Sequence, residues 1–240
     1  MRQTLKQQDY FEYAIDESSS YIKELEGHIA TNNPVVVDWA YVYRELFSQQ
    51  LKLFFLKYTL GHSKEELREL ALAAIQNYIT SENHPTGNPE ALRLYIGLYS
   101  DSLKLTSLAI LYDAKDLLID LKTSFEKNKK GNDLVLEVFF TKVMDDNTVS
   151  SKLCYPKIYT DLAGLSQSED HETIIKNYLD GWYEKMKKTE WYNLHKKSKV
   201  NGATPFYGYW SMEAAALVKI FNLDISLFEE YEYFPKDLLI

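Results

Sequence analysis

The sequence has very little cysteine, glycine or proline for its length. Cys154 is the only cysteine in 240 residues, which excludes an intramolecular disulfide and a structural zinc site built from several cysteines. The 9 glycines and 6 prolines are too few for the many tight turns that an all-β chain of this length needs. The scarcity of both residues favours long helices joined by few connections.

Long apolar segments are missing as well. No run approaches the roughly 18 apolar residues of a membrane-spanning helix. Residues 1–9 lack the apolar centre of a signal peptide. We therefore expect a cytoplasmic protein without a membrane partner.

Motifs for catalysis and cofactor binding are also absent. The sequence contains no glycine-rich phosphate loop, nucleophile elbow, HExxH motif or EF-hand pattern. The five histidines have no metal-ligand spacing; they are His28, His62, His84, His171 and His195. These absences predict a protein that is not an enzyme, carries no cofactor and holds no metal.

The chain does have a helical pattern of apolar residues over most of its length. Apolar residues make up 45% of it, enough for a substantial core. They recur at steps of three and four, as on one face of a helix, in residues 9–30 and from Val36 to Tyr58. Similar spacing predicts a helix that breaks or bends near Asp113, one across Ile175–Met186 and one across Tyr209–Phe221. The fold class is therefore all-α.

Helix ends can also be predicted from local sequence. Asn33-Pro34 and Asn88-Pro89 each combine a capping residue with a proline suited to the first helical position. Gly61 is a typical C-terminal stop. Ser63-Lys64-Glu65-Glu66 has the form of a capping box that opens the next helix.

The polar segment Glu126–Asn132 is the best linker candidate. It predicts two helical subdomains packed together, residues 1–127 and 133–240, in a bundle of long antiparallel helices. The apolar run Leu134–Phe140 fits either a strand or a buried helix, and its helical surroundings favour the helix.

One carboxylate near the C-terminus falls within an apolar stripe. If Tyr209–Phe221 is helical, Glu213 shares a face with Trp210 and Leu217. An unpaired buried carboxylate is very costly, so Glu213 needs a partner or a proton. One hypothesis makes it the general acid or base of a helical hydrolase, with His195 nearby. The other makes it hold a loop through hydrogen bonds from Tyr207, His195 or backbone amides, and the three alanines that follow it favour this structural role.

Negative charge is concentrated in parts of the chain. The net charge is −8, and the segment 9–26 alone carries six acids against one lysine. Such a field repels nucleic acid and attracts basic surfaces. Two acidic triplets follow the spacing i, i+3, i+7 and should each line one side of a helix: Asp9, Glu12 and Asp16, and Asp113, Asp116 and Asp120. They are either solvated faces or contacts to a basic partner.

Basic residues cluster between Lys185 and Lys199, interleaved with Trp191 and Tyr192. Aromatic residues among lysines are one pattern of nucleic-acid binding. Against a net charge of −8 they favour a solvated face or internal counter-charges, and we expect no nucleic-acid partner.

The C-terminal half resembles the PoNi immunity family. Three segments carry this resemblance in order: Trp191-Tyr192-Asn193-Leu194-His195-Lys196, then Tyr207-Gly208-Tyr209-Trp210-Ser211-Met212-Glu213-Ala214-Ala215-Ala216, then Tyr233-Phe234-Pro235-Lys236-Asp237-Leu238. The N-terminal half resembles the matching PoNi domain in length and in its tyrosine-rich helices. The resemblance therefore extends over most of the chain.

The resemblance implies an all-α immunity protein without a cofactor. Its partner would be a PoNe-type toxin, a DNase of the PD-(D/E)xK superfamily delivered between competing bacteria. Since a DNase presents a basic cleft to DNA, an acidic face is its natural complement, and the two acidic triplets are our candidates for toxin contacts. The signature residues are assigned mainly to the fold: Trp191, His195, Tyr207, Gly208, Tyr209, Trp210 and Glu213. The rival hypotheses are a helical adaptor or regulatory protein with another basic partner, and the hydrolase that uses Glu213 and His195.

Overall fold

Most of the chain that the structure describes is helical. The computed structural model describes residues 1–36, 38–84, 95–127, 132–144, 150, 152–199 and 206–240. All regular secondary structure in these ranges is α-helix or 3-10 helix, which confirms the all-α prediction. None of the helices in these ranges is both long enough and apolar enough to cross a membrane.

The chain forms two compact units. The N-terminal unit comprises Met1–Asn88 and Asn193–Gly208, and the C-terminal unit comprises Pro89–Tyr192 and Tyr209–Ile240. Each unit is thus built from two stretches of chain, whereas a boundary predicted along the sequence gives continuous domains. Most of the predicted linker falls on residues 128–131, outside the described residues, and the predicted boundary there stays a prediction.

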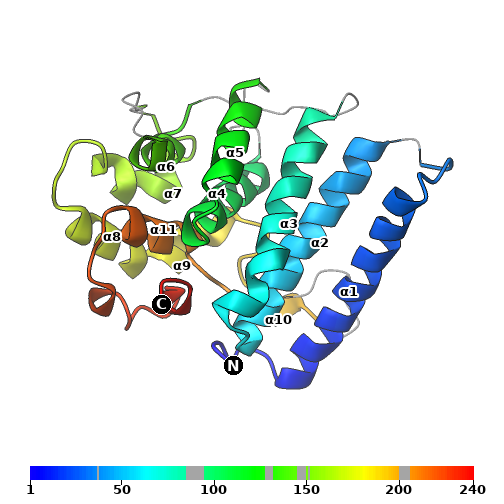
Figure 1. Cartoon of the computed structure of the whole chain (residues 1–240). Coiled ribbons are helices and arrows are strands. Elements are labelled where there is room, and N and C mark those ends of the chain that lie inside the picture. Colours follow the sequence, from blue (N-terminus) through cyan, green and yellow to red (C-terminus); the bar gives the residue numbers. More distant parts are fainter. Residues whose placement is uncertain (37, 85–94, 128–131, 145–149, 151, 200–205) are drawn as a thin grey trace. The chain divides into compact units, whose positions relative to one another are not determined.

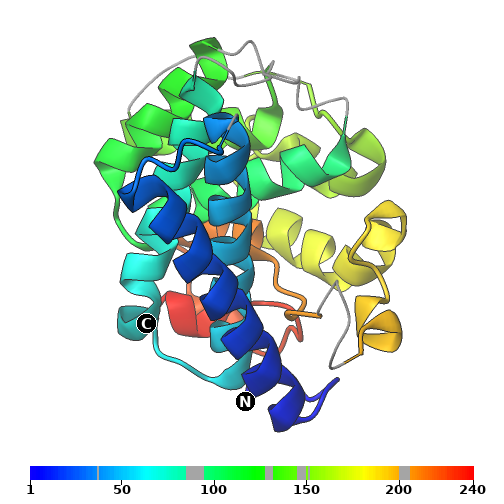
Figure 2. The same cartoon turned by 90° about the vertical axis from the view of Figure 1, so that its right-hand side faces the viewer.

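Three antiparallel helices form most of the N-terminal unit: α1 (Gln8–Ala30), α2 (Trp39–Leu60) and α3 (Lys64–Asn83). The central helix α2 packs against both α1 and α3 (Figure 1). The view turned by 90° shows α1 crossing the face of α2 (Figure 2). A short helix, α10 (Leu194–Lys197), belongs to the second stretch of this unit.

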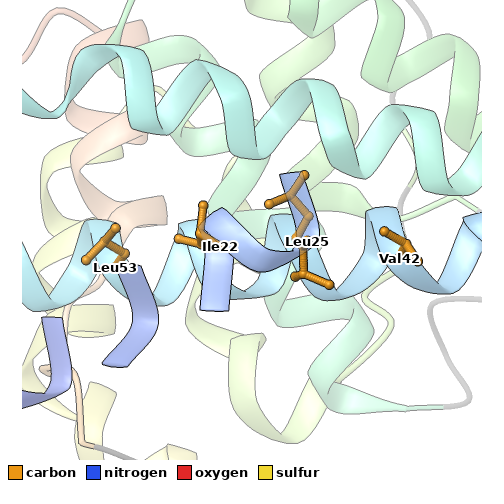
Figure 3. Close-up of a cluster of buried hydrophobic side chains, with 5 residues drawn as sticks. Ile22, Leu25, Val42 and Leu53 are labelled. Atoms are coloured by element: carbon orange, nitrogen blue, oxygen red, sulfur yellow. The ribbon is translucent and has the colours of Figure 1, made fainter. Parts of the chain in front are cut away.

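The seam between α1 and α2 is closed by aliphatic side chains. Ile22 and Leu25 of α1 meet Val42, Leu46 and Leu53 of α2, and each of the five is at most 7% exposed (Figure 3). Burying one such side chain stabilises a protein by about 1.5–3 kcal/mol. This seam explains the apolar spacing of both helices in the sequence.

Local capping explains the turn between α2 and α3, as predicted. Gly61 ends α2 with φ +119°, in the left-handed region where a side chain would be strained. Ser63 Oγ then accepts the amide of Glu66, while Glu66 accepts the amide of Ser63 at 2.7 Å. This reciprocal pair is the predicted capping box.

The start of α2 was predicted wrongly. Helix α2 begins at Trp39, and Asp38 is its cap, accepting the amide of Tyr41 at 3.0 Å. Asn33 instead uses its side chain in a local turn, accepting the amide of Val35 at 3.0 Å. An Asn-Pro pair favours a turn as readily as a helix start, and here the turn prevails. The second such pair, Asn88-Pro89, lies outside the described residues.

The cap of α3 gives a first testable prediction. Ser63→Ala removes the side-chain acceptor at the start of α3 and should lower the free energy of unfolding by about 1 kcal/mol. Urea unfolding followed by circular dichroism measures this difference. Ser20→Ala is the matched control: Ser20 is exposed within α1, where alanine is the better helix former, so its stability should be unchanged or slightly higher.

The C-terminal unit has shorter helices arranged around a buried one. Its described α-helices of nine or more residues are α4 (Ile96–Leu111), α5 (Lys115–Lys127), α6 (Leu134–Met144), α8 (His171–Asp180) and α11 (Met212–Ile220). Helix α11 packs against α4, α6 and α8, and its residues from Met212 to Val218 are all buried. The ambiguous run Leu134–Phe140 is part of α6 and is helical, as predicted.

Two predicted helices of this unit have different bounds. The helix expected across Ile175–Met186 is interrupted at Gly181, which separates α8 from the single turn α9 (Trp182–Lys185). The helix expected from Tyr209 begins only at Met212. The backbone of Ser211 is not helical (φ −82°, ψ 81°), and its amide is bonded to the carbonyl of Tyr233 at 2.8 Å. Residues 206–211 are non-helical and lead into α11.

Candidate functional site

Glu213 is the centre of a buried polar cluster in the C-terminal unit. It lies in the first turn of α11 and is 4% exposed. Its Oε1 accepts three hydrogen bonds: from the Tyr178 hydroxyl at 2.6 Å, from Trp182 Nε1 at 2.7 Å and from the Ser211 hydroxyl at 2.9 Å. One carboxylate therefore joins α8, α9 and the start of α11.

The electrostatics of this cluster keep the phenols protonated. Burial raises the pKa of the Tyr178 hydroxyl well above its ordinary value, and the nearby Glu213 raises it further. The same two causes, in the same order, raise the pKa of Tyr159. The first turn of a helix also favours a carboxylate, because unpaired amides point toward it. The cluster thus places a buried acceptor, the Glu213 carboxylate, among hydroxyl groups that keep their protons.

This geometry supports the structural hypothesis for Glu213. The alanines that follow it, from Ala214 to Ala216, are fully buried, so the helix approaches its neighbours closely. The donors differ from those predicted, since Tyr178, Trp182 and Ser211 are bonded to it in place of Tyr207 and His195.

His195 and Tyr207 belong to the N-terminal unit. The His195 ring meets the edge of the Phe206 ring, with centroids 5.9 Å apart, and burial lowers the pKa of the imidazole. The Tyr207 ring lies 5.9 Å from that of Phe55, and its carbonyl accepts the Thr59 hydroxyl at 3.0 Å. Both signature residues thus pack the second stretch of chain into this unit.

The remaining signature residues surround the Glu213 cluster or precede it. Trp191 stacks on Trp182 with ring centroids 5.3 Å apart, and it meets Tyr209 at 5.6 Å. Tyr209 and Trp210 are buried, and Gly208 has φ +104°, a conformation that favours glycine. These positions are consistent with the role in the fold that we assigned to them.

The acidic triplet of α1 is arranged as predicted. Asp9, Glu12 and Asp16 are all exposed and belong to one helix of the N-terminal unit. Glu12 accepts a hydrogen bond from Gln8 at 2.7 Å. The other carboxylates remain open to solvent, so the row can meet a partner.

The second acidic triplet does not lie on one helix. Asp113 occupies the turn between α4 and α5 with φ +55°, and its Oδ1 is 2.8 Å from Lys219 Nζ. Only Asp116 and Asp120 lie on α5, one helical turn apart and exposed. The prediction was wrong for Asp113, which lies in the turn between α4 and α5. The spacing i, i+3, i+7 places residues on one side only within a continuous helix.

The basic run supplies internal counter-charges in part. Lys185 pairs with Asp161, and Lys187 pairs with Glu184 at 2.5 Å. Burial lowers the pKa of the Lys185 ammonium.

In the described ranges no group of three or more His, Cys, Asp or Glu side chains is placed to hold a metal ion.

A second buried carboxylate, Asp133, was not predicted from the sequence. Its Oδ1 accepts the Tyr99 hydroxyl at 2.9 Å and the amide of Val135 at 2.9 Å, and its Oδ2 accepts the amide of Cys154 at 2.7 Å. Burial raises the pKa of this carboxyl, although the amide bonds act in the opposite direction. An aspartate directly before the apolar run of α6 was the available signal, because that is a preferred helix cap.

Comparison with known families accounts for both halves of the chain. A family model described as "PoNe immunity protein (PoNi), N-terminal" matches residues 2–120, and one described as "PoNe immunity proteins (PoNi), C-terminal" matches residues 131–238. The chain belongs to the PoNi family. It is therefore an immunity protein against PoNe toxins and not an enzyme, as the resemblance implied.

A solved structure shares the fold of this PoNi chain. Protein PA2201 from Pseudomonas aeruginosa matches with a TM-score of 0.75 and 17% sequence identity, covering 95% of this chain and 86% of that protein. At this identity the similarity concerns the fold alone. No curated protein matches the sequence.

Proposed function

We propose that this PoNi protein acts in the cytoplasm and neutralises a PoNe toxin that is a DNase of the PD-(D/E)xK superfamily, used in competition between bacteria. Inhibition would consist of covering the basic DNA-binding cleft of the toxin with an acidic helical face. The observation that carries this proposal is the net charge of −8 together with exposed carboxylates on α1 and α5.

Charge complementarity between the two proteins supports this proposal. A nuclease needs cationic side chains around the phosphates of its substrate, and these groups repel one another until DNA is bound. An acidic protein surface relieves this repulsion, speeds the encounter and disfavours partners of the wrong charge. The candidate contacts are Asp9, Glu12 and Asp16 on α1, and Asp116 and Asp120 on α5. Asp113 is a weaker candidate than we predicted, because Lys219 already pairs with it.

Co-expression tests the immunity function. The product of the reading frame beside the gene for this protein should stop growth when expressed alone, and growth should return when both are expressed. In a purified mixture, cleavage of plasmid DNA should end at an equimolar ratio. A neighbouring product that stays toxic, or cleaves DNA equally fast at excess inhibitor, would contradict the assignment of this toxin.

A second measurement tests how inhibition occurs. A catalytically inactive variant of the toxin is bound to fluorescently labelled duplex DNA, and this PoNi protein is then added. If the acidic face covers the cleft, DNA is released and fluorescence anisotropy falls to the value of free DNA. A stable complex of toxin, DNA and inhibitor would rule out coverage of the cleft while leaving the immunity function intact.

A further inference from the structure

A recess of about 370 Å³ opens on the C-terminal unit where four helices meet. Its apolar lining comes from four helices: Ala109 and Ile110 of α4, Leu118 of α5, Val143 of α6 and Ile220 of α11. The volume is near the lower end for ligand pockets, about 300–1,000 Å³. It is sufficient for one or two side chains of a partner protein.

The rim of this recess is cationic, in contrast to the chain as a whole. Lys115, Lys142 and Lys219 line it together with a single acid, Asp113. Lys219 is already engaged, since its Nζ lies 2.8 Å from Asp113 Oδ1 and 3.1 Å from the carbonyl oxygen of Leu111.

The other two ammonium groups have no acidic partner in the described part of the chain. Lys142 Nζ lies 5.3 Å from the centre of the Phe221 ring. Within the described ranges, neither Lys115 nor Lys142 has a carboxylate at ion-pair distance. Among the described residues, the recess thus presents two lysines without a paired carboxylate beside an apolar lining, in a protein of net charge −8.

Lys115 occupies a position that the helix itself does not favour. It is the first residue of α5, where the unpaired amides make a positive end and disfavour a cation. A carboxylate at this position would stabilise the helix better. Lys115 therefore does not contribute to folding through its charge, whereas an anion arriving from outside would meet both the ammonium group and the amide end of α5.

We propose that this recess receives a carboxylate side chain of the PoNe toxin, held between Lys115 and Lys142 with its methylene groups on the apolar lining. The inference rests on the proposed function and adds a contact of opposite charge to it. An acidic face attracts any basic partner, whereas a cationic recess inside an acidic surface fits only a toxin that has a carboxylate at the matching place. A nucleic-acid backbone is a poorer occupant, since Asp116 and Asp120 on the same helix repel successive phosphates.

Lys115→Glu tests this proposal, because a carboxylate in the recess and general attraction to a basic toxin predict opposite changes in affinity. The substitution makes the protein more acidic by two charges, so attraction to a basic toxin alone would tighten binding. A carboxylate in the recess would instead be repelled. We expect the Kd for the catalytically inactive toxin, measured by calorimetry or surface plasmon resonance, to rise at least tenfold, and Lys142→Glu should act in the same direction.

Lys157→Glu is the matched control. Lys157 is an exposed lysine on α7 (Pro156–Tyr159) of the same unit and does not line the recess. The Kd of the Lys157→Glu variant for the inactive toxin should be unchanged or slightly lower. The melting temperature of isolated Lys115→Glu should equal that of the wild type or exceed it, because the helix end gains an acid. A lowered melting temperature would show that Lys115 is paired within its own chain, and it would overturn the proposal.

The possible results separate this inference from the proposed function. If the wild type does not bind the toxin, the proposed function fails. If the wild type binds and Lys115→Glu binds equally well or more tightly, the inference about the recess is wrong while the proposed function stands. Binding of labelled duplex DNA by this protein alone, lost in Lys115→Glu, would assign the recess to phosphate and overturn the proposal. Toxin variants selected to be neutralised by Lys115→Glu should carry an acid-to-lysine or acid-to-arginine exchange.

Discussion

Glu213→Ala should destabilise the protein by roughly 2–5 kcal/mol, a large part of the ~5–15 kcal/mol that holds a typical domain folded. The substitution removes the acceptor of three buried donors. The Ser211 hydroxyl can rotate toward another acceptor, but the Tyr178 hydroxyl and Trp182 Nε1 have fixed positions and lose their bonds at about 1–3 kcal/mol each. Urea unfolding followed by tryptophan fluorescence is the appropriate measurement, because Trp182 and Trp191 are stacked beside the site.

Two further variants show whether the carboxylate acts through its hydrogen bonds. Glu213→Gln keeps one carbonyl oxygen in the place of Oε1 and should lose markedly less stability than the alanine variant. Glu190→Ala removes an exposed glutamate of the same unit and should change stability by no more than about 0.5 kcal/mol. Wild-type stability of Glu213→Ala together with loss of toxin inhibition would contradict the structural role and move Glu213 to the binding surface.

Local features that depend on residues close together in the chain could be predicted from the sequence. The capping box at Ser63, the stop at Gly61 and the break near Asp113 all arise from short-range hydrogen bonds and backbone preferences. Asn33-Pro34 shows the limit of this reasoning, since the same pair suits a helix start and a turn. The helix begins further along the chain, where the Asp38 carboxylate accepts the amide of Tyr41 and caps α2.

The site itself depended on contacts that sequence spacing does not contain. The apolar stripe around Glu213 correctly indicated that its carboxylate needs partners. Tyr178 and Trp182, however, precede it by 35 and 31 positions. They reach it only because α8 packs against α11 and α9 directly follows α8. Similarly, the lysines of the recess come from three separate helices and form no pattern in the sequence.

Reversing two carboxylates on a helix that faces the toxin should slow association at least tenfold at low salt. Electrostatic steering raises association rates by about 10- to 1,000-fold, and it acts through the local charge near the contact. The two test variants are Glu12→Lys/Asp16→Lys on α1 and Asp116→Lys/Asp120→Lys on α5. Stopped-flow measurement of the association rate constant with the inactive toxin, at 20 mM and at 1 M salt, gives the comparison. The slowing should largely vanish at 1 M salt, where charges are screened beyond about 3 Å.

The control for this experiment has the same change in net charge at another place. Glu169→Lys/Glu190→Lys also raises the net charge by four, at exposed positions of the C-terminal unit outside the candidate rows. If all three double variants slow association equally, only the total charge matters, and neither α1 nor α5 is a specific face. If one test variant slows association more than the control, its helix faces the toxin on approach. A strong effect of the α5 variant would place the encounter beside Lys115, because both acids follow it on the same helix, and would join the steering surface to the recess.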